Sequence, residues 1–213
     1  MEVNVFFLPF SFLLLIVFIL LLPLLFLLIQ IGIIGVAFAK LGLSPKTAFL
    51  ILIFSLVGSM INIPIVRRGI YGNWVSPFSA EVGQLICVNL GGAIIPLLLC
   101  IYLLPKVPLR TTIIVTLIMI LVSKLLTRVV PGVGFTIPAL IPPLIAAFLA
   151  VILSSKNSAP VAYISGVLGI LIGSDLLNLY QLQAVGAPMI SIGGAGVYDG
   201  IFLVGIISAL LTF

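Results

Sequence analysis

The chain contains no histidine, and this absence excludes several kinds of functional site. Of its 213 residues only 6% are charged, four are acidic and two are cysteine. With no histidine and only Cys87 and Cys100 as soft ligands, a zinc or haem centre lacks donors, so we expect neither a metal nor a cofactor. The two cysteines fall on one predicted helix about 20 Å apart, at a rise of about 1.5 Å per residue. That distance is too long for a disulfide.

The scarcity of charge also excludes a water-soluble domain, which carries about a quarter of charged residues. Hydrophobic residues make up 63% of the chain, and the mean hydropathy is +1.53. The net charge of +5 suggests a nucleic-acid partner at first sight. The nine lysines and arginines are scattered singly between apolar segments, however, as topology signals are. We therefore predict a single integral membrane domain over residues 1–213, with the lipid bilayer as its partner and no nucleic acid.

The apolar segments predict an all-α fold, a polytopic transmembrane helix bundle with about seven spans. The first segment resembles a signal peptide, but its apolar part is too long and it begins with Glu2. Pro138, Pro142 and Pro143 disfavour an ordinary helix start in the fifth segment, which we expect to be broken or re-entrant. The predicted segments cover residues 6–39, 45–64, 84–104, 111–129, 135–153, 159–180 and 188–211.

Basic residues divide unequally between the two predicted sides of the membrane. Five lie on the side of loop 40–46 and the C-terminus, and four on the other. The positive-inside rule places the first side in the cytoplasm of a cell-membrane protein. The helix-breaking polar motifs all fall in the opposite half, where we expect a cavity that opens to water. They read INIP, VNLGG, PGVG, GSDLLN and SIGGAG.

A faint internal repeat relates residues 40–104 to residues 155–211. In each half a helix ending in Gly-Ser is followed by a second helix that opens with Gly-Gly-Ala. The two copies differ in their acids, because only the second contains aspartates. If the fifth segment spans, the copies run parallel; if it re-enters, they are inverted.

Two aspartates, Asp175 and Asp199, lie within predicted helices six and seven. A charged group inside a bilayer costs roughly 2.5–3.5 kcal/mol, so an intramembrane acid indicates a functional site. Ser174 and Asn178 share a helical face with Asp175. Glycines precede Asp199 and could break its helix to expose backbone groups; they are Gly193, Gly194 and Gly196. Asn62 and Asn89 occupy matching places in the first half. The alternative is that each acid is protonated and bonded to a local backbone carbonyl or asparagine.

The motifs together resemble a prokaryotic multi-pass membrane family, the domain of unknown function sixteen-fourteen. The resemblance extends from about residue 31 to the end of the chain and implies a membrane-embedded protein, without an activity. It rests on AFAKLGLSPKTAF, SLVGSMINIP, VNLGGAIIP, PGVGFTIPALIPPL, GSDLLNLY and, most specifically, SIGGAGVYDGIFL.

A second likeness is to intramembrane aspartyl proteases of the presenilin and signal-peptide-peptidase type. It rests on Tyr198-Asp199, on Gly173-Ser174-Asp175 and on a Pro-Ala-Leu turn at 138–140. The order of these motifs is permuted and the first glycine of Gly-x-Gly-Asp is missing. The likeness implies a catalytic dyad of Asp175 and Asp199 that shares a proton.

Three functions are therefore compared. A small transporter or channel-like carrier for an ion, proton or small solute explains the intramembrane acids and broken helices best. An aspartyl protease and a non-catalytic structural or assembly subunit are the alternatives. For transport we expect both acids to face one interior space, joined there by Asn62 or Asn89.

Overall fold

The computed structural model describes residues 31–154, 156–194 and 200–212, and the predicted first helix over residues 6–30 lies outside them. A helical segment, Ile31–Lys40, is followed by α2 (Pro45–Gly58), and the two meet at a bend of 119°. Ser44 caps α2, because its hydroxyl accepts the N–H of Thr47 at 3.2 Å.

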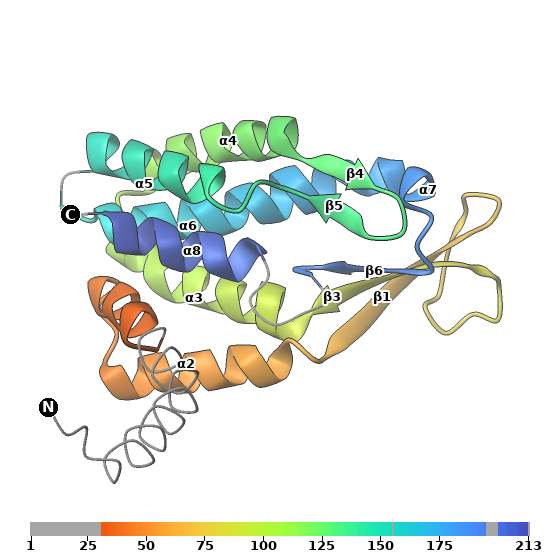
Figure 1. Ribbon diagram of the computed structural model, residues 1–213, viewed down its shortest axis with the longest axis horizontal. Coiled ribbons are helices and arrows are strands. Elements are labelled where there is room, and N and C mark those ends of the chain that lie inside the picture. Colours follow the sequence, from red (N-terminus) through yellow and green to blue (C-terminus); the bar gives the residue numbers. More distant parts are fainter. Residues whose placement is uncertain (1–30, 155, 195–199, 213) are drawn as a thin grey trace, which may run out of the picture.

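The bundle is built around α6 (Ser158–Ile170), which is buried on all sides. The helix continues through a π-helical segment η3 (Leu171–Asp175), a 3₁₀ segment η4 (Leu176–Gln181) and the short α7 (Leu182–Val185). Its neighbours, which surround it in Figure 1, are α3 (Ile95–Leu103), α4 (Leu109–Leu126), α5 (Ile141–Leu153) and α8 (Gly200–Leu211). A helix that is apolar all round is stable only when buried in this way.

Glycines allow these helices to approach α6 closely. A Cβ on Gly169 would lie 2.5 Å from the Cβ of Met119 on α4. One on Gly173 would lie 2.4 Å from a carbonyl oxygen of α4, that of Ile120. On the other face, a Cβ on Gly205 of α8 would lie 2.7 Å from the Tyr163 ring. Small residues at helix crossings are typical of packing inside membranes.

The outward faces of the surrounding helices are apolar, as a membrane protein requires. Phe54 of α2, Leu125 of α4 and Phe148 of α5 are each more than 60% exposed. Two helices of the described chain are long and apolar enough to cross a bilayer, Leu109–Leu126 and Ser158–Val185. The bent pair that ends in α2 makes a third if it counts as one span.

The prediction of an all-α fold is wrong, because four strands form a mixed sheet at one end of the bundle (Figure 1). Their order is β2-β1-β3-β6, with β3 and β6 parallel and the other pairs antiparallel. The strands are β1 (Asn62–Gly69), β2 (Trp74–Val75), β3 (Gly83–Asn89) and β6 (Met189–Ile192). Predicted helices three and seven are thus strand in their first part. Short apolar runs such as LICVN fit either state, and here the β-branched residues pair across strands.

The proline-rich segment contains an ordinary helix start, which the sequence disfavoured, and whether the segment spans the membrane or re-enters stays a prediction. A second hairpin, β4 (Arg128–Val130) with β5 (Gly134–Thr136), leads into α5, which begins at Ile141. Pro142 and Pro143 occupy the first turn of α5. Backbone N–H groups there have no acceptor within the helix, so the N–H that proline lacks costs no hydrogen bond. The helix then runs from the hairpin to the opposite end of the bundle (Figure 1).

Candidate functional site

Four of the five predicted polar motifs, all except PGVG, meet in one layer, where the helices end and the sheet begins. We call this the junction layer and define it by residues 59–62, 89–93, 173–181 and 191–194. At INIP and VNLGG the breaks expected from the sequence are transitions between helix and strand, and at GSDLLN the helix changes from α to π and 3₁₀ geometry. Two of these breaks pass through π-helical segments, η1 (Leu90–Ile94) and η3. Single π turns inside α-helices occur frequently at functional sites.

Asn62 and Asn89 lie opposite each other on β1 and β3 and form a hydrogen-bonded network. The Asn89 amide donates to Asn62 Oδ1 at 3.0 Å and to the Ser59 carbonyl at 2.8 Å. Its own Oδ1 accepts the N–H of Gly92 at 2.8 Å and so caps the helix that follows. Ser191 on β6 donates its hydroxyl to Asn62 Oδ1 at 2.5 Å. Asn89 is fully buried with its polar atoms bonded, which suits a structural role.

The two Gly-Gly motifs are in contact, because the parallel strands β3 and β6 deliver them to the same place. A Cβ on Gly92 would lie 2.1 Å from the carbonyl oxygen of Gly193. A Cβ on Gly193 would lie 2.6 Å from that of Ala93. Gly193 and Gly194 also have φ of +84° and +75°, which only glycine adopts easily. The first motif enters a helix directly, whereas the second forms a left-handed turn.

Asp175 reaches this contact from η3. Its Oδ2 accepts the N–H of Gly193 at 3.1 Å, and the side chain is half-buried. The carboxylate thus joins a π segment of one helix to the glycine turn after β6. The other predicted acid, Asp199, and Gly196 lie outside the described residues, so the distance between the two carboxyl groups and a protease dyad stay predictions.

Ser174 and Asn178, which were expected beside Asp175, belong to a second polar cluster with α4. Both are buried, and the Asn178 amide donates to the Ser174 carbonyl at 2.7 Å. Asn178 Oδ1 accepts a hydrogen bond from the Lys124 ammonium at 2.6 Å. Lys124 also lies 4.5 Å from the centroid of the Tyr180 ring. The carboxamide therefore holds a positive charge next to the segment that carries Asp175.

Lys124, Tyr180 and Ser191 were not among the site residues expected from the sequence. The spacing of Lys124 and Arg128, four residues apart on one helical face, was a usable signal. No comparable signal marked Ser191, because its role depends on the parallel pairing of β6 with β3. The structure brings together Asn62, Asn89, Asp175, Gly193 and, through η4, Asn178.

The chemistry that this layer offers is polar and oxygen-rich. Its groups are one carboxylate, several carboxamides, a serine hydroxyl and backbone carbonyls freed where helices are interrupted. Within the described residues, no three histidine, cysteine or acidic side chains lie close enough to hold a metal ion. Such a donor set suits a proton, an alkali cation or a polar solute better than a transition metal.

A family model described as "Protein of unknown function (DUF1614)" matches residues 56–211. No curated protein matches the chain, and no solved structure does. Because the match covers most of the sequence, the chain belongs to this DUF1614 family.

Proposed function

We propose that this DUF1614 protein is a multi-pass membrane protein that carries a cation, a proton or a small polar solute. The observation that supports it is the convergence of three chain interruptions on Gly193. These are the π segment η1, the π segment η3 with Asp175, and the left-handed turn after β6. Interrupted helices with a carboxylate between them are the parts from which secondary transporters form binding sites.

The membrane placement follows from the order of the segments. In Figure 1, α2, α3, α4, α5, α6 and α8 lie side by side, and each is joined to the next at an end of the bundle. In this proposal these helices and the N-terminal apolar run cross the membrane about seven times. The loop at 40–46 and the C-terminus lie on the cytoplasmic side in this proposal, and the sheet on the other side.

The lysine held by Asn178 adds a second element to the proposal. Asp175 belongs to the junction layer, and the Lys124 ammonium of α4 reaches the same layer through its hydrogen bond to Asn178. A cation or proton that binds Asp175 changes the net charge of this layer. Carriers use such coupling between a fixed positive charge and an acid that gains and loses a proton.

The test is flux through the full chain reconstituted in lipid vesicles. Wild-type vesicles are assayed for H⁺, Na⁺ and K⁺ movement with ion-sensitive dyes inside. We expect Asp175→Asn to lower the flux at least about tenfold, because the amide cannot ionise. Glu81→Gln, which removes an acid near the tip of the β1–β3 hairpin, is the matched control and leaves flux unchanged.

Asp199→Asn is assayed beside these variants, since the sequence places the second acid near the same strand. Absence of flux for every ion tested in wild-type vesicles contradicts an ion or proton carrier. Equal flux in wild type and Asp175→Asn excludes this carboxylate as the site.

A further inference from the structure

We infer that the lysine-lined end of the bundle holds the headgroup of an anionic phospholipid, with one acyl chain in the groove between α2 and α3. This inference uses the membrane placement of the helices and is independent of transport. It concerns the end of the molecule opposite to the junction layer.

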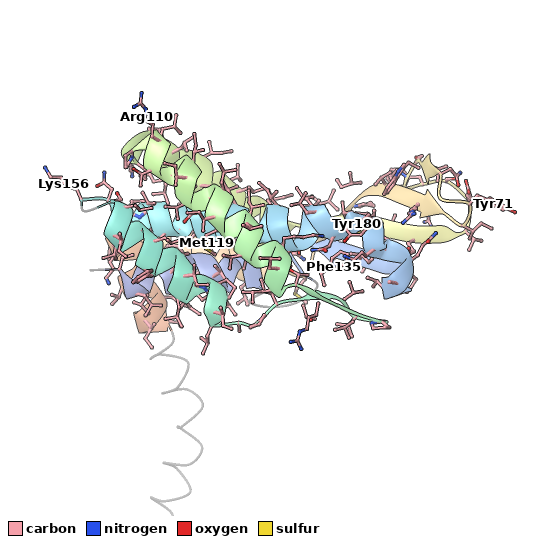
Figure 2. The ribbon with its side chains drawn as sticks, turned by 90° about the horizontal axis from the view of Figure 1, so that it is seen from above. Tyr71, Arg110, Met119, Phe135, Lys156 and Tyr180 are labelled. Carbon is pink, nitrogen blue, oxygen red and sulfur yellow. The ribbon has the colours of Figure 1, made fainter. Side chains whose placement is uncertain are left out.

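A cavity of about 320 Å³ lies at this end, which we call the lysine cavity. It is lined by Lys40, Lys106 and Lys156, and by no acidic residue of the described chain. Asn157 and Ser158, at the start of α6, complete its polar lining. Lys156 and Asn157 also line a neighbouring cavity of about 360 Å³, so the positive surface continues beyond the first one. In Figure 2, Lys156 and Arg110 project from this same end.

Two of the three lysines, Lys40 and Lys106, are held near the cavity by different contacts. The Lys40 ammonium donates hydrogen bonds to the carbonyl oxygens of Leu210 and Thr212, at 2.6 and 2.5 Å. Both carbonyls lie at the C-terminal end of α8. The Asn157 amide donates to the Lys106 carbonyl at 2.9 Å and so fixes the backbone that carries Lys106. Three positive charges and the positive end of the α6 dipole therefore surround one space. The chemistry that fits this space is a phosphate-bearing anion.

An apolar groove of about 580 Å³ runs between α2 and α3 and begins beside the lysine cavity. Leu43 lines the groove, while Leu41 and Gly42, just before it, line the cavity. Tyr102 also lines the groove, and the Lys106 ammonium lies 3.9 Å from the centroid of its ring. The linings of the cavity and the groove are therefore neighbours at residues 41–43 and where Lys106 contacts Tyr102.

The dimensions favour a lipid over a free anion. On α2 the groove extends from Thr47 to Val57, about 15 Å at a rise of about 1.5 Å per residue. This is half of a hydrocarbon core of ~30 Å, the depth of one leaflet. Basic pockets at the cytoplasmic ends of transmembrane helices are places where anionic headgroups bind.

The experiment measures lipid preference on the purified full chain in detergent, by native mass spectrometry. The protein is offered equal amounts of phosphatidylglycerol and phosphatidylcholine, and separately inorganic phosphate. We expect wild type to retain phosphatidylglycerol preferentially. Lys106→Gln with Lys156→Gln should lower this preference by tenfold or more, at roughly fivefold per lysine. Lys106→Arg with Lys156→Arg should retain it.

The matched control removes two charges from the same end but outside the cavity, Lys46→Gln with Arg110→Gln. Equal retention of both lipids by wild type contradicts the inference. So does an equal loss in the control pair, which would indicate a general surface charge. If inorganic phosphate displaces phosphatidylglycerol, the ligand of the cavity is a free anion and the lipid inference is wrong.

The groove has its own test, Leu98→Trp, which adds bulk to its wall at a position that is more than half exposed. This variant should lower retention of both lipids and leave the helical content unchanged. Unaltered retention contradicts the acyl-chain part of the inference. Because none of these measurements involves flux, their outcome is distinguishable from that of the vesicle assay.

Discussion

The two Gly-Gly junctions follow parallel neighbouring strands, yet different groups satisfy their backbone N–H donors. After β3, the N–H of Gly92 is accepted by Asn89, three residues earlier in the same strand-to-helix turn. After β6, the N–H of Gly193 is accepted by Asp175, which comes from another element eighteen residues away. The first junction is neutral and local, and the second depends on an ionisable group of a distant helix. The comparison separates a junction closed by a neutral side chain of its own turn from one closed by an ionisable side chain of another element.

The largest loss of stability is expected when a side chain fills the contact between the two glycine motifs. Gly193→Ala places a Cβ 2.6 Å from Ala93 and forces a side chain into a left-handed conformation. We expect a loss of about 3–5 kcal/mol in unfolding free energy, from overpacking and backbone strain together. Thermal or denaturant unfolding in detergent measures it. Gly35→Ala, where a Cβ meets nothing within 4 Å, should change stability by less than ~1 kcal/mol; a similar loss in both variants contradicts the contact.

Asn89→Ala should have the next largest effect. It removes a helix cap and leaves the Ser59 carbonyl and the Gly92 N–H unpaired in a buried place. Together these cost about 2–4 kcal/mol. The same unfolding measurement applies, with Asn73→Ala on the exposed hairpin as control. A loss no larger than that of the control would show that water replaces the lost bonds.

Asp175 should matter less for stability than for function. Asp175→Asn keeps an oxygen that can accept the Gly193 N–H, so the expected loss of stability is below about 1.5 kcal/mol. Asp175→Ala leaves that donor unpaired, and we expect a further loss of about 1 kcal/mol. A difference between these variants in unfolding experiments supports a junction that needs an acceptor, whereas equal stability shows that the bond contributes nothing.

The smallest expected effect is a difference in labelling rate between two facing positions, one on β3 and one on β6. Cys87 on β3 lies opposite Ser191 on β6, and burial raises the pKa of the Cys87 thiol. A raised pKa keeps the unreactive protonated form at neutral pH, so maleimide labelling of Cys87 should be slow and should accelerate only in more alkaline solution. In a Cys87→Ser, Cys100→Ser background, Ser191→Cys is half-buried and should label faster. Equal rates would contradict a difference in access.

The sequence was sufficient for the helical part of the fold and for the position of its polar centre. The length of the apolar segments predicted α4 and the continuous helix from α6 through η4 to within a few residues, because neither depends on pairing with another element. The strands were missed because LICVN and MISI are apolar runs that helix and strand share. Only the pairing of β3 with β6, about a hundred residues apart, decides between them. Long-range pairing of this kind leaves no local pattern.

The candidate site was predictable in its members more than in its arrangement. Asn62, Asn89, Asp175 and Gly193 could be singled out because polar residues and glycines are rare in apolar segments. Their partners could not be assigned, since the bond from Gly193 to Asp175 exists only when η3 lies beside the turn after β6. Lys124 shows the same limit, because its partner Asn178 belongs to another helix. The repeat between the two halves stays a prediction, although its two Gly-Gly motifs are neighbours in space.

The π-helical segment η3 has a further geometric consequence. A π turn holds one residue more than an α turn, and an α-helix advances about 100° per residue at 3.6 residues per turn. Moving that extra residue to a different turn of the same helix rotates the intervening side chains by about this angle. Asp175 lies at the end of η3, so a shift of the bulge would turn its carboxylate from Gly193 toward a different neighbour. A shift of the π turn would therefore reorient Asp175 without displacing the two ends of the central helix.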